Sequence, residues 1–374
     1  MTAELPPPWL PQAERDGATI FITGHSLTDL PLPNFLEAIA RSQAATHVWN
    51  RQYVVGSTIE QRSRGTGSNV ADWPGYRRGD NKDGSPIDVV DELRSPKTPG
   101  ARSYDVLLIT EMHSVLASYL WFDTVRLLRH YHDLFISSNP QGRTYFYESW
   151  LGILDKSAPA RWIDYERAAS PVWQCAATRI NVSLAHAGRT DRITPLPAGL
   201  ALAELVARAT EGAGLPGITA GTPRETVDAL VADDVHLTRR GSYYVALVTY
   251  AAIYRRSPVG AWAPSDIDAQ TADAMQKFAW NFVVDFYARS QPMPLADCRA
   301  LVSGPFNELF WNYTFDQGQQ GLGWGPADLI RSINERLRKG RNIKRTASTF
   351  SAEDASNPLY FSPALDDTYW YPPL

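Results

Sequence analysis

Short apolar, β-branched runs alternate with stretches of helical periodicity along the first two thirds of the chain. The strand-like runs cover residues 18–24, 47–56, 104–111, 143–150 and 192–199, and helical patterns follow them at 32–43, 114–135, 162–188, 201–214 and 242–258. Strands that alternate with helices predict a parallel sheet covered on both faces, because each parallel connection must cross over the sheet. We therefore expect an α/β fold, with a kink in the third helix near Pro171.

The alternation divides the chain into three parts. We expect an N-terminal extension (1–17), an α/β core (18–258) and a C-terminal extension (259–374) with helical patterns near 266–290 and 326–339. The extension either packs on the core as a cap or runs as a partly extended arm. Within the core, residues 57–103 are rich in Gly, Arg, Asp, Ser and Pro and exceed the usual length of a connection, which indicates an insertion or flap.

Composition narrows the classes of function. With 44% hydrophobic residues the chain of 374 residues can build a large core, and its net charge of −4 lacks the basic excess of a nucleic-acid binder. No run of about 18 apolar residues predicts a membrane span. The first residues do not follow the pattern of a secretory signal, which predicts a cytoplasmic protein, or a periplasmic or secreted one if a leader has been removed.

Cysteine and histidine spacings give no sign of a metal centre. Cys175 and Cys298 are too few for a disulfide scaffold, and we expect both to be buried thiols. His130 and His132 lie two residues apart, so a helix would place them on different faces. The basic run at 335–345 is expected to be a solvated helix end. We expect neither a metal nor an organic cofactor.

A serine follows the first predicted strand, in the segment Gly24-His25-Ser26-Leu27-Thr28-Asp29. Ligands of open parallel sheets bind beyond the carboxyl ends of the strands, so this serine is well placed to act as a nucleophile. A helix start behind it would offer backbone N–H groups to a developing oxyanion. The alternative is a helix-capping serine without catalytic function.

A second segment with candidate catalytic residues lies just before the last core helix and reads Asp233-Asp234-Val235-His236-Leu237-Thr238. A serine hydroxyl needs an imidazole to take its proton, and the imidazole needs a carboxylate that fixes its tautomer. The spacing of Asp233 and His236 lets the two side chains meet within one turn. The alternative is a helix-capping aspartate beside a surface histidine.

Together these two segments resemble the first and last motif blocks of the SGNH, or GDSL-like, serine hydrolases. The resemblance covers residues 18–258 and implies a flavodoxin-like three-layer α/β/α sandwich that hydrolyses esters, commonly O-acetyl groups on carbohydrates, through an acyl-serine. It implies that Ser26 is the nucleophile, His236 the base and then the acid, and Asp233 the orienting carboxylate. The N–H groups of Ser26 and Gly56 would bind the oxyanion, although Gly56 also fits a plain turn.

The sequence departs from the family pattern at two positions. His25 replaces the aspartate that usually follows the first glycine, either as a new hydrogen-bonding partner or as a packing substitution. The third block lacks its asparagine and reads Thr110-Glu111-Met112-His113. Either His113 supplies the missing N–H, or Glu111 binds a substrate hydroxyl or ammonium, or the oxyanion hole uses backbone donors alone.

Three further residues end the fourth predicted strand at the same edge of the sheet: Tyr147, Glu148 and Trp150. Aromatic and polar side chains there either contact a sugar or belong to the core. The sequence as a whole predicts a serine esterase with a small-molecule or glycan ester substrate. The alternatives are an acyltransferase on the same scaffold and a non-catalytic glycan-binding protein.

Overall fold

The computed structural model describes residue 9 and residues 14–64, 75–97, 103–319 and 349–350, with the side chains of 315–319 excluded. Five parallel strands form one sheet in the order β2-β1-β3-β4-β5. They are β1 (Gly17–Gly24), β2 (Thr46–Tyr53), β3 (Val106–Thr110), β4 (Arg143–Tyr147) and β5 (Ile193–Leu196). This is the flavodoxin-like strand order, as the resemblance implied.

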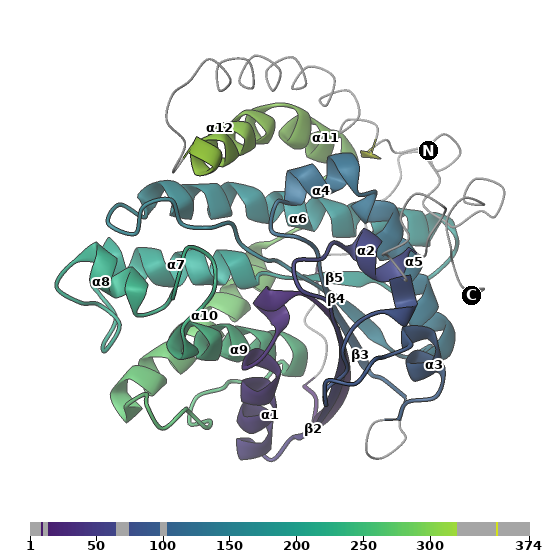
Figure 1. Ribbon diagram of the computed structural model, residues 1–374, viewed down its shortest axis with the longest axis horizontal. Coiled ribbons are helices and arrows are strands. Elements are labelled where there is room, and N and C mark those ends of the chain that lie inside the picture. Colours follow the sequence, from purple (N-terminus) through teal and green to yellow (C-terminus); the bar gives the residue numbers. More distant parts are fainter. Residues whose placement is uncertain (1–8, 10–13, 65–74, 98–102, 320–348, 351–374) are drawn as a thin grey trace.

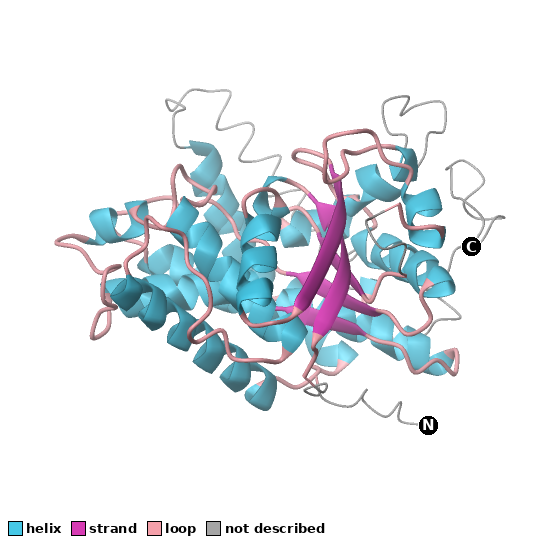
Figure 2. Cartoon of the chain, turned by 90° about the horizontal axis from the view of Figure 1, so that it is seen from below, coloured by secondary structure: helices cyan, strands magenta, loops and turns pink. Residues whose placement is uncertain are grey.

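Helices cover both faces of the twisted sheet (Figure 2). Figure 1 shows α1, α9 and α10 on one side and α2, α3 and α5 on the other. The helices of the core are α1 (Leu32–Ser42), α2 (Ile59–Ser63), α3 (Val89–Arg94), α4 (Val115–Trp121), α5 (Thr124–Ser138), α6 (Ala160–His186), α7 (Ala198–Thr210), α8 (Pro223–Asp228) and α9 (Arg239–Tyr254). Short 3₁₀ turns, η1 (Ser26–Thr28) and η2 (Gly75–Arg77), complete it. The chain is thus a three-layer α/β/α sandwich.

The five expected strands are all present because their apolar runs are buried on both faces. Every residue of β3 is buried, as is every residue of β1 after Gly17, which is the burial expected of central parallel strands. For two strands the predicted C-terminal end lay too far along the sequence. The second strand ends at Tyr53 rather than at Gly56, and the fourth ends at Tyr147 rather than at Trp150.

The expected helix over 114–135 is wrong, because two helices occupy that segment. Asp123 takes a left-handed backbone conformation with φ of 50° and separates α4 from α5. Conversely, α6 runs through Pro171 as one helix. The described parts of the 57–103 insertion form α2 and α3, which pack against α5, while residues 65–74 and 98–102 lie outside the described residues.

The C-terminal extension contributes three described helices that pack on the core: α10 (Ala269–Arg289), α11 (Leu295–Ser303) and α12 (Pro305–Gln319). α10 contacts α9 and α7, whereas α11 and α12 contact α6 (Figure 1). The predicted helix near 326–339 and the basic run at 335–345 lie outside the described residues.

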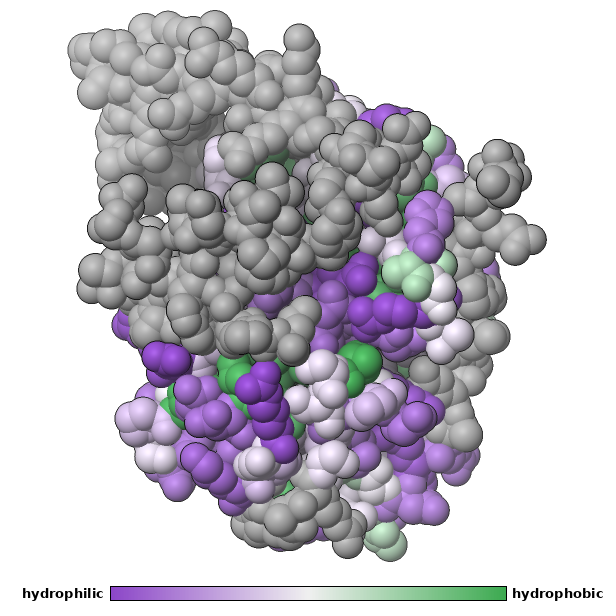
Figure 3. All heavy atoms as spheres, turned by 90° about the vertical axis from the view of Figure 1, so that its right-hand side faces the viewer, coloured by the Kyte–Doolittle hydropathy of each residue, from purple (hydrophilic) through white to green (hydrophobic). Residues whose placement is uncertain are grey.

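The surface of the described residues is largely polar on the face shown in Figure 3, where apolar groups form small separate patches. Among the described helices, none combines the length and the apolar character needed to cross a bilayer.

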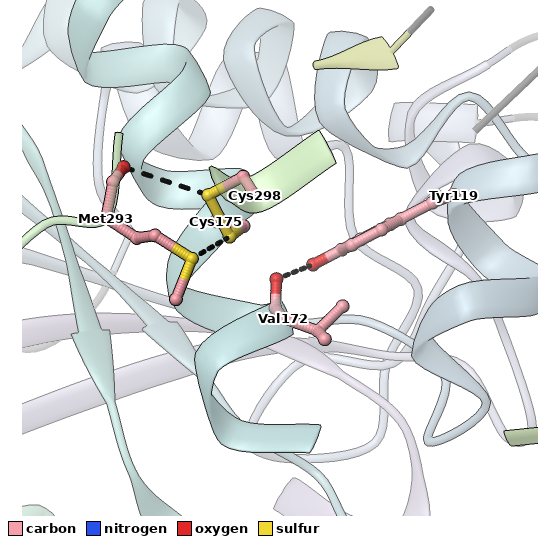
Figure 4. Close-up of a disulfide and its surroundings, with 5 residues drawn as sticks. All are labelled: Tyr119, Val172, Cys175, Met293 and Cys298. Atoms are coloured by element: carbon pink, nitrogen blue, oxygen red, sulfur yellow. Dashed lines mark hydrogen bonds between the residues drawn. A yellow bond between two sulfur atoms is a disulfide. The ribbon is translucent and has the colours of Figure 1, made fainter. Parts of the chain in front are cut away.

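A disulfide joins the extension to the core and overturns the expectation of two thiols. Cys175 of α6 and Cys298 of α11 are bonded across a sequence separation of 123 residues, with Met293 against the sulfurs (Figure 4). Only the packing of α11 on α6 brings the two cysteines together, so their spacing in the sequence carried no signal.

Removing this crosslink should destabilise the protein. A closed loop of this length restricts the unfolded chain strongly, so we expect Cys175→Ser combined with Cys298→Ser to lower the free energy of unfolding by about 2–5 kcal/mol. Urea unfolding of both proteins measures the difference. A reductant should destabilise the wild type and leave the double variant unchanged, and free thiols in the unreduced wild type would contradict the assignment.

Candidate active site

The three residues expected to form a catalytic triad meet at the carboxyl edge of the sheet. His236 Nε2 lies 3.1 Å from Ser26 Oγ, and His236 Nδ1 lies 2.7 Å from Asp233 Oδ2. These two hydrogen bonds form a relay from Asp233 through His236 to Ser26. The side chains of His236 and Asp233 are 49% and 55% exposed, so the relay is open to solvent and to a substrate. Ser26 follows β1 at the switch point between β1 and β3, which is where doubly wound sheets of this strand order bind ligands.

The Asp233–His236 pair forms within one local turn. Asp233 Oδ1 accepts the N–H groups of Val235 at 2.8 Å and His236 at 2.7 Å, while its other oxygen faces the imidazole. Partial burial opposes ionisation, but these N–H donors and the imidazole lower the pKa of Asp233 to about 2. The carboxylate therefore stays ionised at neutral pH and fixes a proton on His236 Nδ1.

Ser26 is placed by a tight turn that requires a glycine. Thr28 Oγ1 donates to the carbonyl of His25 at 3.1 Å. A Cβ on residue 24 would lie only 2.0 Å from Thr28 Oγ1, so this position requires glycine. Burial, assisted by the charge of Arg62, lowers the pKa of His25 to about 3, so its ring is neutral. Its Nδ1 accepts the N–H of Leu27, and its Nε2 donates to the carbonyl of Glu111 at 3.1 Å. His25 thus ties the serine turn to the loop after β3.

Gly56 lies in the loop after β2 rather than at the strand end. Its φ of +57° lies in the left-handed region that favours glycine, and the position is exposed. The loop is held beside β1, because Val54 N–H donates to the carbonyl of Gly24 at 3.1 Å. The buried guanidinium of Arg62 donates to both the carbonyl and the hydroxyl of Ser57 at 2.8 Å.

Glu111 is a buried structural residue, and the reading that it binds a substrate group is corrected. Its side chain has no exposed surface. Oε1 accepts the N–H groups of Ile59 at 3.1 Å and Met112 at 2.7 Å, and Oε2 accepts the hydroxyl of Thr124 at 2.7 Å. Burial raises the pKa of Glu111 against the opposing charge of Arg62. The charge of Arg62 and the hydrogen bonds from Ile59, Met112 and Thr124 favour the ionised carboxylate, whereas burial opposes it.

His113, the other third-block candidate, is partly buried and lies near the triad. Burial lowers the pKa of His113, and the neighbouring charges that act on it belong to Asp234 and His236. A neutral imidazole carries one N–H donor. In the described residues no hydrogen bond involves the ring of His113, which leaves that donor available.

The strand-end candidates Tyr147, Glu148 and Trp150 are buried, with 0%, 1% and 1% exposure, so the expectation of contact with a sugar is corrected. Trp150 Nε1 instead donates to the carbonyl of Val235 at 2.8 Å, inside the loop that carries the triad. Burial raises the pKa of Glu148 to about 8, and the Ser170 hydroxyl donates to its carboxyl group at 2.8 Å.

Three residues that hold this site were absent from the sequence-based predictions. Arg62 lies in the supposed insertion, Glu166 lies within α6, and Tyr313 lies in the C-terminal extension. All three are buried. Arg62 donates to Ser57 and also to Thr23 and the carbonyl of Thr110, which lie farther away in the sequence. Glu166 accepts the N–H of Leu151, and Tyr313 donates to the carbonyl of Gly152 across 161 residues. A charged residue in an apolar helical pattern, as at Glu166, was the one signal available.

A hollow of about 600 Å³ lies beside β2 and is lined by residues of β2 and of the 81–97 segment. Its polar groups bond to one another, for example Asn50 to Glu92 at 3.1 Å, so it indicates no ligand. No group of three or more His, Cys, Asp or Glu side chains within the described residues is arranged to hold a metal ion.

No protein-family model and no curated protein matches the chain. A solved structure of a DUF4886 family protein from Bacteroides uniformis is similar, with 14% sequence identity, a TM-score of 0.49 and coverage of 72% of this chain and 95% of that one.

The buried charge of Glu111 should be essential for stability. Glu111→Gln would leave the Arg62 charge without its buried counterpart, and we expect the free energy of unfolding to fall by about 3–5 kcal/mol. Urea unfolding measures it, with Asp273→Asn in the exposed Lys277 pair as the matched control. Adding Arg62→Met to Glu111→Gln should recover part of the loss. Equal effects of Glu111→Gln and the control would refute the assignment.

Proposed function

We propose that this protein is a serine esterase that cleaves small acyl esters through an acyl-serine intermediate. The observation that carries the proposal is the continuous relay from Asp233 through His236 to Ser26, formed by residues from opposite ends of the core. The relay has the order, the distances and the solvent access that the chemistry requires. The O-acetylated glycan that the family resemblance implies is the proposed substrate class.

The proposed reaction has two stages. Ser26 Oγ attacks the acyl carbon while His236 Nε2 takes its proton, and the imidazolium then gives that proton to the departing alcohol. Water, deprotonated by the same imidazole, attacks the acyl-serine, and the carboxylic acid leaves as Ser26 regains a proton. The ionised Asp233 stabilises the imidazolium in both stages.

We propose that the oxyanion is bound by the N–H groups of Ser26 and Gly56 together with the ring of His113. Among the described residues neither backbone N–H has an acceptor. His113 stands in the block where the family carries an asparagine, and its neutral ring keeps a donor at neutral pH. Glu111 is not available for this role, because its oxygens are occupied and it carries no donor.

The disulfide is relevant to the cellular compartment in which the protein is found. Disulfides persist in oxidising environments and are rare in reducing ones. The Cys175–Cys298 bond therefore supports a periplasmic or secreted protein over a cytoplasmic one.

Replacing the nucleophile should abolish the chemistry. We expect Ser26→Ala to reduce p-nitrophenyl acetate hydrolysis by at least about 10³-fold and to prevent labelling by a fluorophosphonate. Asp233→Asn should still be labelled, but more slowly. Circular dichroism confirms that each variant is folded. A wild type that neither hydrolyses the ester nor takes the label would contradict the esterase and favour a binding protein.

The role of His113 can be tested by restoring the family residue. We expect His113→Ala to lower kcat by about 100-fold, the usual cost of one oxyanion donor. His113→Asn should recover much of the loss because the amide also donates. Steady-state kinetics on p-nitrophenyl acetate distinguishes the variants, and full activity in His113→Ala would leave backbone donors as the whole oxyanion hole.

A further inference from the structure

The loop that carries Asp233 and His236 is closed internally but needs outside contacts to hold it against Ser26. Ala232 N–H donates to the carbonyl of His236 at 2.7 Å, and the hydrogen bonds to Asp233 Oδ1 lie in the same turn. These bonds fix Asp233 and His236 to each other. They do not set the distance to Ser26, which comes from the other end of the core.

Two hydrogen bonds link the tip of this loop to the connection between β4 and α6. Trp150 Nε1 donates to the carbonyl of Val235, and Ile153 N–H donates to the carbonyl of Asp234, both at 2.8 Å. The acceptors are the two residues between Asp233 and His236. The 150–153 segment therefore holds the backbone on which the imidazole of His236 is carried.

The 150–153 segment is itself held by buried side chains. Leu151 N–H donates to Glu166 Oε1 at 2.8 Å, and Trp162 Nε1 donates to the carbonyl of Leu151 at 2.8 Å. From the C-terminal extension, Tyr313 Oη donates to the carbonyl of Gly152 at 2.8 Å. Tyr313 is fully buried, and its ring stacks on Tyr165 at 4.6 Å. α12 thus reaches the triad loop through one intermediate segment.

We propose that Trp150 and Tyr313 are positioning residues that hold His236 at its working distance from Ser26, so that the C-terminal extension forms part of the catalytic framework. This inference rests on the proposed esterase function. It gives the extension a defined role: Tyr313 fixes Gly152, and Trp150 and Ile153 fix the carbonyls beside His236. A displacement of the order of 1 Å at a catalytic group can cost about 100-fold in rate.

The test uses the full chain with variants that remove one hydrogen-bond donor and keep an aromatic ring. We expect Trp150→Phe to lower kcat for p-nitrophenyl acetate by about 10- to 100-fold, with KM changed less than about twofold and the pH profile retained. Tyr313→Phe should lower kcat by a smaller factor. In the double variant kcat should fall by less than the product of the two single factors, because both residues act on the same loop. The rate of fluorophosphonate labelling should fall in parallel with kcat.

Two matched controls separate positioning from general loss of stability. Trp49→Phe removes a buried indole donor to Glu37, and Tyr244→Phe removes a buried hydroxyl donor to the carbonyl of Ala201. Both should lower the melting temperature without a comparable loss of kcat. If Trp150→Phe and Tyr313→Phe lose no more kcat than these controls at a similar melting temperature, the inference is overturned.

Crystal structures of the wild type and Trp150→Phe provide a readout that does not depend on activity. We expect the distance from His236 Nε2 to Ser26 Oγ to increase in the variant, and an unchanged distance would overturn the positioning role. An inactive wild type would refute the esterase proposal, whereas a shifted His236 in the variant would still support the mechanical link.

Discussion

The carboxyl edge of the sheet depends on two buried residues, Arg62 through its guanidinium and Glu111 through both its carboxylate and its main-chain carbonyl. Ser57, in the loop after β2, accepts hydrogen bonds from the Arg62 guanidinium, and the Glu111 carboxylate accepts the N–H of Ile59 at the start of α2. The main-chain carbonyl of Glu111 accepts from His25 in the loop after β1 and from the Ser149 hydroxyl in the loop after β4, the latter at 2.8 Å. Taking two charges out of water is costly, so the arrangement is stable only because their hydrogen-bonding groups are satisfied. Four loops that bear candidate residues are thereby tied together.

This constraint gives a physical reason for the unusual third motif block. The Glu111 carboxyl oxygens are fully buried and hold α2 and α5 through Ile59 and Thr124, so this side chain is not free to donate to an oxyanion. Under the proposed function the donor therefore comes from another residue of this loop, and the proposed donor is His113, whose pKa is lowered by burial. In this proposal Glu111 serves the structure of the loop, and His113 supplies the donor.

The sequence was most informative where the chemistry is local. Buried parallel strands read as continuous apolar runs, so the sheet could be predicted. Asp233 and His236 share one turn, so their spacing was sufficient. The end of β4 was predicted too late because the following residues stay buried, and Glu148 N–H still bonds the carbonyl of Leu196. The end of β2 was predicted too late because Val54 and Val55 prolong the β-branched pattern, although Val55 is exposed. The roles of Arg62 and Tyr313, and the disulfide, depend on contacts between distant segments, which residue type and spacing do not encode.

The two hydrogen bonds of the relay differ in how they are secured. Asp233 and His236 are 3 residues apart and share a turn that holds them even if its surroundings move. Ser26 and His236 are 210 residues apart, and both side chains are carried by loops rather than strands. Their distance is therefore set by the packing of those loops, on one side through His25 and Glu111 and on the other through Trp150, Ile153 and Tyr313. Under the proposed function the extension serves the chemistry as well as the stability, because the longer hydrogen bond of the relay is the one that long-range packing must maintain.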